Sequence, residues 1–242
     1  MLRTGFYYFL TWSYIILTLP VLLKVKYLER RGRTEERDRL ADRYTMKAAK
    51  RLLWLIGASI SVAGLENVPE GLPVLFVGNH QSHADSLIVH GFIDIPKGFV
   101  SIVEILNIPV LRTWMKYMKC VFIDRSDARQ NVQAMETAVE NLRQGRSMVI
   151  FPEGRVYEDG RLHEFRRGCL KLAFKTGASI VPVTLKNSNS LMNRDGTRIR
   201  PGSAECIIHS PISVKGYKKA EEAQLIERVR SVIAGGLQDT MK

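Results

Sequence analysis

His80 and Asp85 are the residues whose types and spacing are best suited to catalysis. They lie in the stretch GNHQSHADS, residues 78–86, which follows an apolar run at 74–77 and precedes another at 87–93. This order predicts a turn from a strand into a helix. On one regular helix, a spacing of five residues would put the two side chains about 140° apart. With His80 in the turn and Asp85 in the first helical turn, the carboxylate can instead fold back to orient the imidazole, as a general base requires.

Other interpretations of this stretch stay open. Asp85 can cap the helix beside a buried His80, which would be a purely structural role. His80, His83 and Asp85 are also of the types that ligate zinc or manganese. The other histidines are scattered and no second acidic cluster completes such a site, so we expect no metal. Ser82 is a candidate covalent nucleophile, but the sequence lacks the Gly-x-Ser-x-Gly motif of a nucleophile elbow.

Two later motifs carry arginine. The sequence FIDR at residues 122–125 closes a predicted strand, and its guanidinium suits bidentate capture of a phosphate. An ordinary ion pair with Asp124 or Asp127 is the alternative. The sequence FPEGR at residues 151–155 follows another predicted strand, and its glycine lets the backbone approach a ligand closely.

The framework that must position these motifs is predicted to be a parallel α/β sheet. Short apolar runs rich in β-branched and aromatic residues are typical of buried strands, and stretches with helical periodicity separate them. Such an order indicates a mixed, largely parallel sheet flanked by helices, with ligand sites at the carboxyl ends of the strands. The expected strands are 74–77, 99–103, 121–123, 148–151, 180–185 and 205–208, and the expected helices are 87–93, 129–143, 165–175 and 220–237.

The N-terminal region contains an uncharged run, residues 5–23, which is close to the shortest length that can cross a bilayer. A removable signal peptide fits poorly, because the basic cluster follows the run and no small-residue cleavage site is evident. That cluster, from Lys24 to Arg33, places the following domain on the cytoplasmic side of the cell membrane by the positive-inside rule. Pro20 breaks the run late, so a helix lying in the interface is an alternative to a full span.

Residues 40–56 predict a second, amphipathic helix that is crowded by Lys and Arg. Such a helix can lie in the plane of the lipid headgroups or pack on the soluble domain with its charges solvated, and both alternatives stay open. We therefore expect N-terminal membrane-anchoring helices in residues 1–57 and one α/β domain in residues 58–242.

The composition favours a membrane surface over nucleic acid as the charged partner. Lys and Arg number 36 against 24 Asp and Glu, which gives a formal net charge of +12 and an attraction to polyanions. The positive charge clusters beside the apolar run and no stacking aromatics interleave with it, so we expect no nucleic acid. The three cysteines are far apart and form no metal or disulfide pattern, which is typical of a reducing compartment.

Taken together, the motifs resemble those of the glycerolipid acyltransferases, most closely the bacterial 1-acylglycerol-3-phosphate acyltransferases. Four blocks occur in the family's order over residues 60–215. They are a His-x4-Asp block at 79–85, Phe-Ile-Asp-Arg at 122–125, Phe-Pro-Glu-Gly at 151–154 and Ile-Val-Pro-Val at 180–183. The sequence FRRG at 165–168 also fits a segment of the family.

The resemblance implies roles for individual residues. His80 would be the general base and Asp85 its partner, Arg125 would bind a phosphate, and Glu153 and Gly154 would shape acceptor binding. The implied reaction moves a fatty acyl group from acyl-CoA or acyl carrier protein to the free hydroxyl of 1-acylglycerol-3-phosphate, giving phosphatidic acid, by direct attack without a metal, another cofactor or a covalent intermediate. The resemblance also implies helices that hold an acyltransferase domain on the membrane bilayer.

Two positions depart from the family's pattern. The third block usually continues Thr-Arg-Ser, whereas here Arg155 is followed by Val156. A Lys usually stands two residues before a Glu-Leu pair between the first two blocks, whereas Ile102 precedes Glu104 here. Either Arg155 partly replaces a missing phosphate ligand, or the acceptor is a lysophospholipid with a larger headgroup. A non-catalytic lipid-binding module on the same fold is a further alternative.

Overall fold

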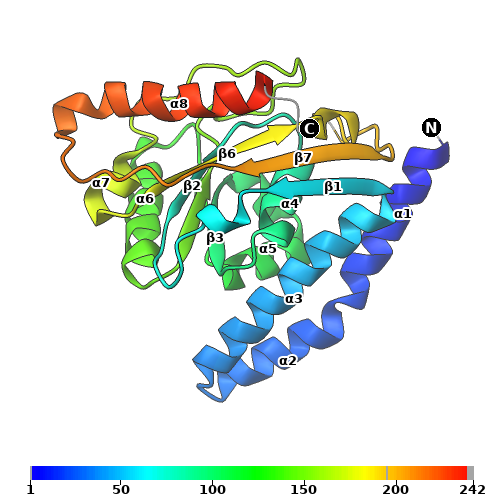
Figure 1. The fold of residues 1–242 in the computed structure, drawn as a ribbon. Coiled ribbons are helices and arrows are strands. Elements are labelled where there is room, and N and C mark those ends of the chain that lie inside the picture. Colours follow the sequence, from blue (N-terminus) through cyan, green and yellow to red (C-terminus); the bar gives the residue numbers. More distant parts are fainter. Residues whose placement is uncertain (1, 195, 239–242) are drawn as a thin grey trace.

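Short runs of apolar residues form a seven-stranded sheet in the computed structural model, which describes residues 2–194 and 196–238 (Figure 1). The strands lie in the order β1-β7-β6-β2-β5-β3-β4, and every neighbouring pair is parallel except β6 and β7. The predicted mixed, largely parallel sheet is therefore confirmed. The strands are β1 (Ala58–Ala63), β2 (Leu75–Gly78), β3 (Lys97–Ile102), β4 (Val121–Ile123), β5 (Ser147–Ile150), β6 (Ile180–Lys186) and β7 (Gly202–Ile208).

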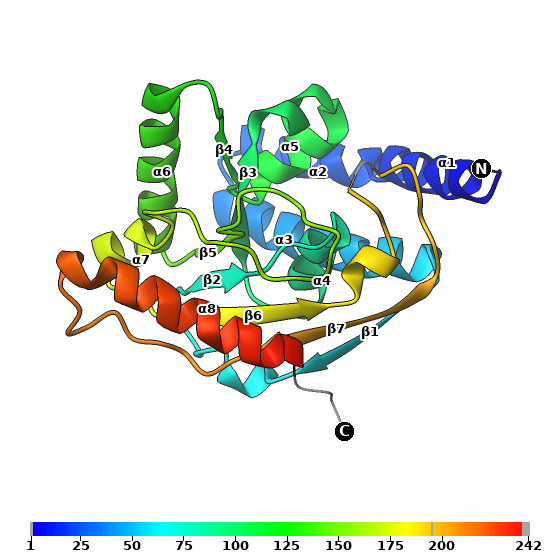
Figure 2. The same ribbon diagram turned by 90° about the horizontal axis from the view of Figure 1, so that it is seen from above.

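Two layers of helices cover the two faces of the sheet (Figures 1 and 2). Alternate residues of β2 face different layers: Phe76 packs in one apolar cluster, and Leu75 and Val77 pack in the other. A strand buried on both faces reads as a continuous apolar run, which is why β2 was predictable. The first layer holds α3 (Thr34–Leu55), α4 (Ala84–Phe92) and α5 (Pro109–Tyr117), and the second holds α6 (Ala128–Arg143), α7 (Lys171–Thr176) and α8 (Glu222–Gln238). Short 3-10 helices cover Leu65–Asn67, Val103–Asn107, Ser188–Ser190 and Lys219–Glu221.

The N-terminal run forms two consecutive helices, α1 (Leu2–Leu17) and α2 (Leu19–Arg30). The break comes at Thr18 rather than after Pro20, because proline has no N–H to lose in the first turn of a helix and therefore suits the start of α2. The helical segment Gly5–Arg30 is long and apolar enough to cross a membrane, and only 12% of its apolar window is buried against the rest of the protein. Its exposed apolar face is consistent with a membrane anchor.

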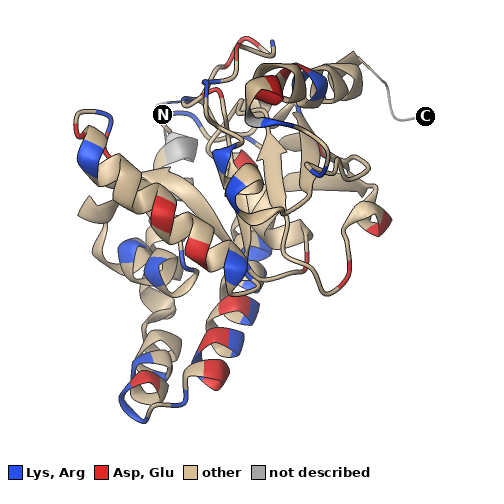
Figure 3. Ribbon diagram, turned by 90° about the vertical axis from the view of Figure 1, so that its left-hand side faces the viewer, with Lys and Arg blue, Asp and Glu red and all other residues tan. Residues whose placement is uncertain are grey.

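Helix α3 packs on the α/β domain with one face. Ala41, Ala49 and Leu53 are buried, and α3 contacts both α4 and α5. This favours the predicted alternative in which the amphipathic helix lies against the domain. Its outer face remains exposed and carries Arg43 and Lys47. Acidic and basic residues lie next to each other along its first turns (Figure 3), so the local charges there partly cancel.

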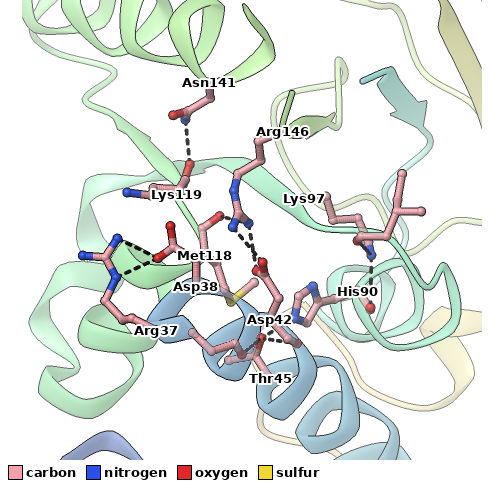
Figure 4. Close-up of polar contacts among 12 residues, drawn as sticks. Arg37, Asp38, Asp42, Thr45, His90, Lys97, Met118, Lys119, Asn141 and Arg146 are labelled. Atoms are coloured by element: carbon pink, nitrogen blue, oxygen red, sulfur yellow. Dashed lines mark hydrogen bonds and ion pairs between the residues drawn. The ribbon is translucent and has the colours of Figure 1, made fainter. Parts of the chain in front are cut away.

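A network of polar side chains is buried where α3 meets α4 and the sheet (Figure 4). Asp42 on α3 accepts two hydrogen bonds, of 2.9 and 2.8 Å, from the guanidinium of Arg146 before β5. One turn further, Oγ1 of Thr45 lies 2.9 Å from Nε2 of His90 on α4. Lys97 is fully buried and donates to three main-chain carbonyls at the end of α4. Burial lowers the pKa of Lys97 to about 7. The network fixes α4 between α3 and the sheet.

Three elements differ from the predictions. The strand β1 and the helix α5 were not expected. The predicted helix 165–175 was wrong over its first half: α7 begins only at Lys171, because Gly168 has a φ of 77°, in the left-handed region that interrupts a helix. Gly145 and Gly177, which follow α6 and α7, have φ values of 85° and 73°, the left-handed conformation in which helices commonly end.

Candidate active site

His80 and Asp85 meet at the carboxyl end of β2, as their spacing predicts. Nδ1 of His80 lies 2.9 Å from Oδ2 of Asp85, which is fully buried in the first turn of α4. The same carboxylate oxygen accepts the backbone N–H groups of Gln81 and Ser82, at 2.7 and 2.8 Å. A carboxylate held in this way takes its hydrogen bond from Nδ1–H of His80. The opposite nitrogen, Nε2, is then the basic one.

Phe151 stacks on the imidazole of His80 and so restricts the plane of that ring. Its ring stacks on that of His80 with the centroids 4.2 Å apart and an angle of 10° between the planes. Phe151 directly follows β5, and β5 pairs with β2, so the two rings come from adjacent strand ends. Gly78 makes this approach feasible, since a Cβ there would lie 3.3 Å from the ring of Phe151. Sequence reasoning placed Phe151 in a motif but did not predict this contact.

Glu153 links the loop after β5 to the backbone of His80 by a hydrogen bond. Its Oε1 accepts the N–H of His80 at 2.8 Å, and its Oε2 accepts the N–H of His163 at 3.0 Å. Burial raises the pKa of this carboxyl, although the two backbone N–H groups oppose the shift. The N–H of Tyr157 also donates to the carbonyl of His80, at 2.9 Å. Glu153 therefore supports a positioning role, and its predicted contact with the acceptor stays a prediction.

The two predicted phosphate ligands, Arg125 and Arg155, both line one cavity with Gly154. Nη2 of Arg125 donates to the carbonyl of Gly154 at 2.5 Å, although Arg125 follows β4 and Gly154 follows β5. Among the described residues, Arg125 has no ion pair with Asp124 or Asp127. Instead, Asp127 caps α6 and Asp124 accepts from Ser126. The guanidinium of Arg155 lies 4.6 Å from the centroid of the Tyr157 ring.

A cavity of about 1580 Å³ joins these residues to the N-terminal helices. His80, Arg125, Gly154 and Arg155 line its polar part. The remaining wall is largely apolar and is built from both helical layers and from α1. Its apolar residues include Ile15, Leu52, Leu87, Met115, Met118 and Val139. This volume exceeds the roughly 300–1,000 Å³ of a typical small-ligand pocket.

Comparisons with known proteins agree with this geometry. A family model described as Acyltransferase matches residues 59–186. The chain belongs to the acyltransferase family. It is 33% identical over 186 residues to 1-acyl-sn-glycerol-3-phosphate acyltransferase of Borreliella burgdorferi, covering 77% of this chain and 74% of that one. It is 36% identical to the chloroplast enzyme LPAT1 of Arabidopsis thaliana, where the match covers 63% of this chain but only 43% of the relative.

A solved acyltransferase structure has the same fold over nearly the whole chain. The crystal structure of the 1-acyl-sn-glycerophosphate (LPA) acyltransferase PlsC from Thermotoga maritima superposes with a TM-score of 0.84 at 28% identity. The match covers 98% of this chain and 95% of that one. The resemblance predicted from the four blocks is thus confirmed, and the N-terminal helices are part of the shared fold.

The two departures from the family's pattern both lie on the wall of this acyltransferase's cavity. Ile102 is the last residue of β3, and Val156 is buried after the glutamate motif. Apolar side chains therefore occupy two wall positions at which the family usually carries a cation. The predicted compensation by Arg155 stays a prediction.

The alternative chemistries lack support in the geometry. The hydroxyl of Ser82 is buried and donates to the carbonyl of Met192 at 2.7 Å, so it does not face the cavity as a nucleophile. All three cysteines are free and buried, and burial raises the pKa of each thiol to about 12. Nε2 of His83 lies 2.8 Å from the carbonyl of Arg194. Within the described residues, no cluster of three or more His, Cys, Asp or Glu side chains could hold a metal.

Asn79 is a further residue of the acyltransferase site that sequence reasoning did not single out. Its amide makes two hydrogen bonds of 2.8 Å with the backbone of Leu185, one as donor and one as acceptor. These bonds join the end of β2 to β6, and they set where the chain turns toward His80. The only sequence signal was its position immediately before the base.

Proposed function

We propose that this acyltransferase moves a fatty acyl group from an acyl thioester to the free hydroxyl of 1-acylglycerol-3-phosphate, which yields phosphatidic acid for phospholipid synthesis. The observation that carries the proposal is the His80–Asp85 pair at the junction between a cationic rim and a large apolar cavity. The names of the relatives from Borreliella burgdorferi and Thermotoga maritima support this choice of acceptor. Acyl-CoA and acyl carrier protein are the candidate donors.

The proposed mechanism is direct. Nε2 of His80 removes the proton from the acceptor hydroxyl while the oxygen attacks the thioester carbonyl. The tetrahedral intermediate then collapses, the carbon–sulfur bond breaks, and the thiolate takes the proton back from the imidazolium. Asp85 stabilises the imidazolium in between, and general-base help of this kind typically contributes about 10²–10⁴-fold. These steps need no metal or other cofactor.

The N-terminal helices are proposed to hold the cavity at the surface of the cell membrane, with the catalytic domain on the cytoplasmic side. Phe9, Leu17 and Leu23 are 66–71% exposed, so their apolar surface has no partner within the described chain. The basic residues that follow would contact anionic headgroups, each contributing about 1 kcal/mol. Because α1 also lines the cavity, a lipid acceptor can reach the base from the bilayer.

One observation favours a second class of acceptor, a lysophospholipid with a larger headgroup. Ile102 and Val156 replace two cations on the cavity wall, which would weaken binding of a phosphomonoester and tolerate a larger headgroup. A non-catalytic lipid-binding role would need no oriented base, so the geometry at His80 argues against it.

The deciding experiment is thiol release from an acyl thioester, with and without 1-acylglycerol-3-phosphate. We expect release to require both the acceptor and His80, and His80→Ala to retain its thermal midpoint. Release without acceptor would indicate a thioesterase. Release only with other lysophospholipids would indicate a different acceptor, and none with any of them would leave a lipid-binding module.

A further inference from the structure

Three arginines gather around one glycine at the cavity mouth. Arg125 donates to the carbonyl of Gly154, and Arg155 is the next residue along the chain. Arg166 lies against Gly154 on the side where any other amino acid would have its side chain. A Cβ on Gly154 would overlap the guanidinium of Arg166. Gly154 also has a φ of 73°, which favours glycine. The absence of a side chain is therefore what lets Arg166 approach.

The position of Arg166 is set by the backbone. Its N–H donates to the carbonyl of Pro152 at 3.0 Å, so the segment before α7 folds back onto the turn that follows β5. Gly168 then turns the chain away, and Lys171 lies over it as a further cation on the cavity wall. Arg166 thus reaches the site from a segment that sequence reasoning had predicted to be helical.

No carboxylate neutralises this group. Within the described residues, Arg125, Arg155 and Arg166 form no ion pair with Asp or Glu. The nearby Glu153 is buried, and both its oxygens are occupied by backbone N–H groups. Like charges that share a site repel one another, and a bound anion removes the repulsion. Guanidinium groups arranged in this way favour a phosphate, which can accept several charge-assisted hydrogen bonds at once.

We infer that Arg166, with Arg125, binds the phosphomonoester of the acceptor across Gly154. This assignment rests on the proposed function. It differs from the compensation by Arg155 alone, since the guanidinium of Arg155 is stacked on Tyr157. The arginines and His80 line the same cavity, so one acceptor molecule could contact both.

The test is the initial rate of phosphatidic acid formation by the full-length enzyme in lipid–detergent micelles. The variants are Arg166→Gln, Arg166→Lys and, as a charge-matched control from the same loop, Arg161→Gln. Arg161 is exposed and does not line the cavity. Loss of a charge-assisted contact should raise KM for 1-acylglycerol-3-phosphate by about 10- to 150-fold in Arg166→Gln. KM for the thioester should stay unchanged, Arg166→Lys should recover part of the loss, and Arg161→Gln should match wild type.

Inhibition by glycerol 3-phosphate gives a second readout, because this probe carries the phosphomonoester without an acyl chain. It should compete with the acceptor in wild type and lose potency in Arg166→Gln. An unchanged acceptor KM in Arg166→Gln would overturn the inference and leave the proposed function standing. A rise confined to the KM of acyl-CoA would also overturn it, by assigning the arginine to the phosphates of the donor. If wild type forms no phosphatidic acid, the proposed function fails and the inference fails with it.

Discussion

The imidazole of His80, the proposed base, is oriented by contacts that do not involve a substrate. Asp85 holds Nδ1 of His80, Phe151 fixes the plane of the ring, and Glu153 holds the backbone N–H. Each contact comes from a different part of the chain, so the base is pre-organised by the fold and little reorganisation is needed when the acceptor binds.

Asp85→Asn should keep the shape of the turn but remove the negative charge that stabilises the imidazolium. We expect kcat to fall by about 10²–10⁴-fold, with little change in either KM, because the residue acts on the transition state rather than on binding. Steady-state kinetics with both substrates varied provide the measurement. A rise in KM at constant kcat would be the contrary result.

Phe151→Leu tests the stack on His80. Leucine keeps the site apolar but cannot lie flat against the imidazole. Aromatic pairs contribute about 0.5–1.5 kcal/mol beyond their buried area, so kcat should fall about 2- to 10-fold. The thermal midpoint of the variant is the control, since an equal loss of stability would assign the effect to packing.

The pairing of His80 with Asp85 could be predicted because both residues lie in one short stretch of the sequence. His80 and Asp85 are separated by five positions, and the strand and helix that flank them are strongly apolar. Phe151 and Asn79 act across strands, so their contacts depend on β2 pairing with both β5 and β6. Nothing in one sequence specifies that pairing, which is why these contacts were missed.

At the scale of elements, α4 carries Asp85, the proposed partner of the base, at one end and meets the buried side chain of Lys97 at the other. Lys97 donates to three carbonyls at the end of α4, where the negative end of the helix dipole lies. Asp85 sits in its first turn. Both ends of α4 are thus held by buried polar contacts.

Lys97 should give stability a distinct pH dependence. An exposed lysine loses its proton near pH 10.5, whereas burial lowers the pKa of Lys97 to about 7. Between these values the unfolded chain binds more protons than the folded chain, so the free energy of unfolding from this site rises with pH. The thermal midpoint of wild type relative to Lys97→Met should therefore increase between about pH 7 and about pH 9. A constant difference would contradict the assignment.

The unpredicted elements have weak local signals. In β1, serines alternate with apolar residues at an edge of the sheet, so the strand lacks the continuous apolar run of a central one. Helix α5 is short and begins at Pro109. In a sequence, a proline indicates the end of a helix as readily as its first turn, so the start of α5 was not recognised. In the predicted helix 165–175, by contrast, Gly168 interrupts the helix, and the prediction did not allow for this interruption.

At the scale of the whole molecule, the N-terminal helices and the catalytic domain are one packed unit. Trp114 of α5 donates to Oγ1 of Thr18 at 2.9 Å, and Tyr117 donates to Glu29 of α2 at 2.8 Å. Asp42 on α3 meets Arg146 beside β5. The predicted boundary at residue 57 stays a prediction, but these contacts cross it.

Asp42→Asn should destabilise the folded protein far more than a matched change in an exposed pair on the same helix. Removing one partner of a buried ion pair leaves an uncompensated charge and typically costs about 3–5 kcal/mol. Glu35 pairs with Arg39 in full exposure, at 88% and 77%, so Glu35→Gln should cost less than about 1 kcal/mol. Denaturant unfolding of both variants in detergent measures the difference. Equal losses would show that Asp42 does not join α3 to the domain.

The two faces of α3 are under different constraints, and this sets how such a chain can diverge. The inner face must match the surfaces it packs on, with Ala49 and Leu53 on the side of α4 and Ala41 beside α2 and α5, so accepted substitutions there should conserve volume. The outer face carries the exposed residues Arg43 and Lys47, so it can change with the lipid composition of the host without affecting the fold. A lineage that moved to a new membrane would therefore be expected to change this helix on one side only.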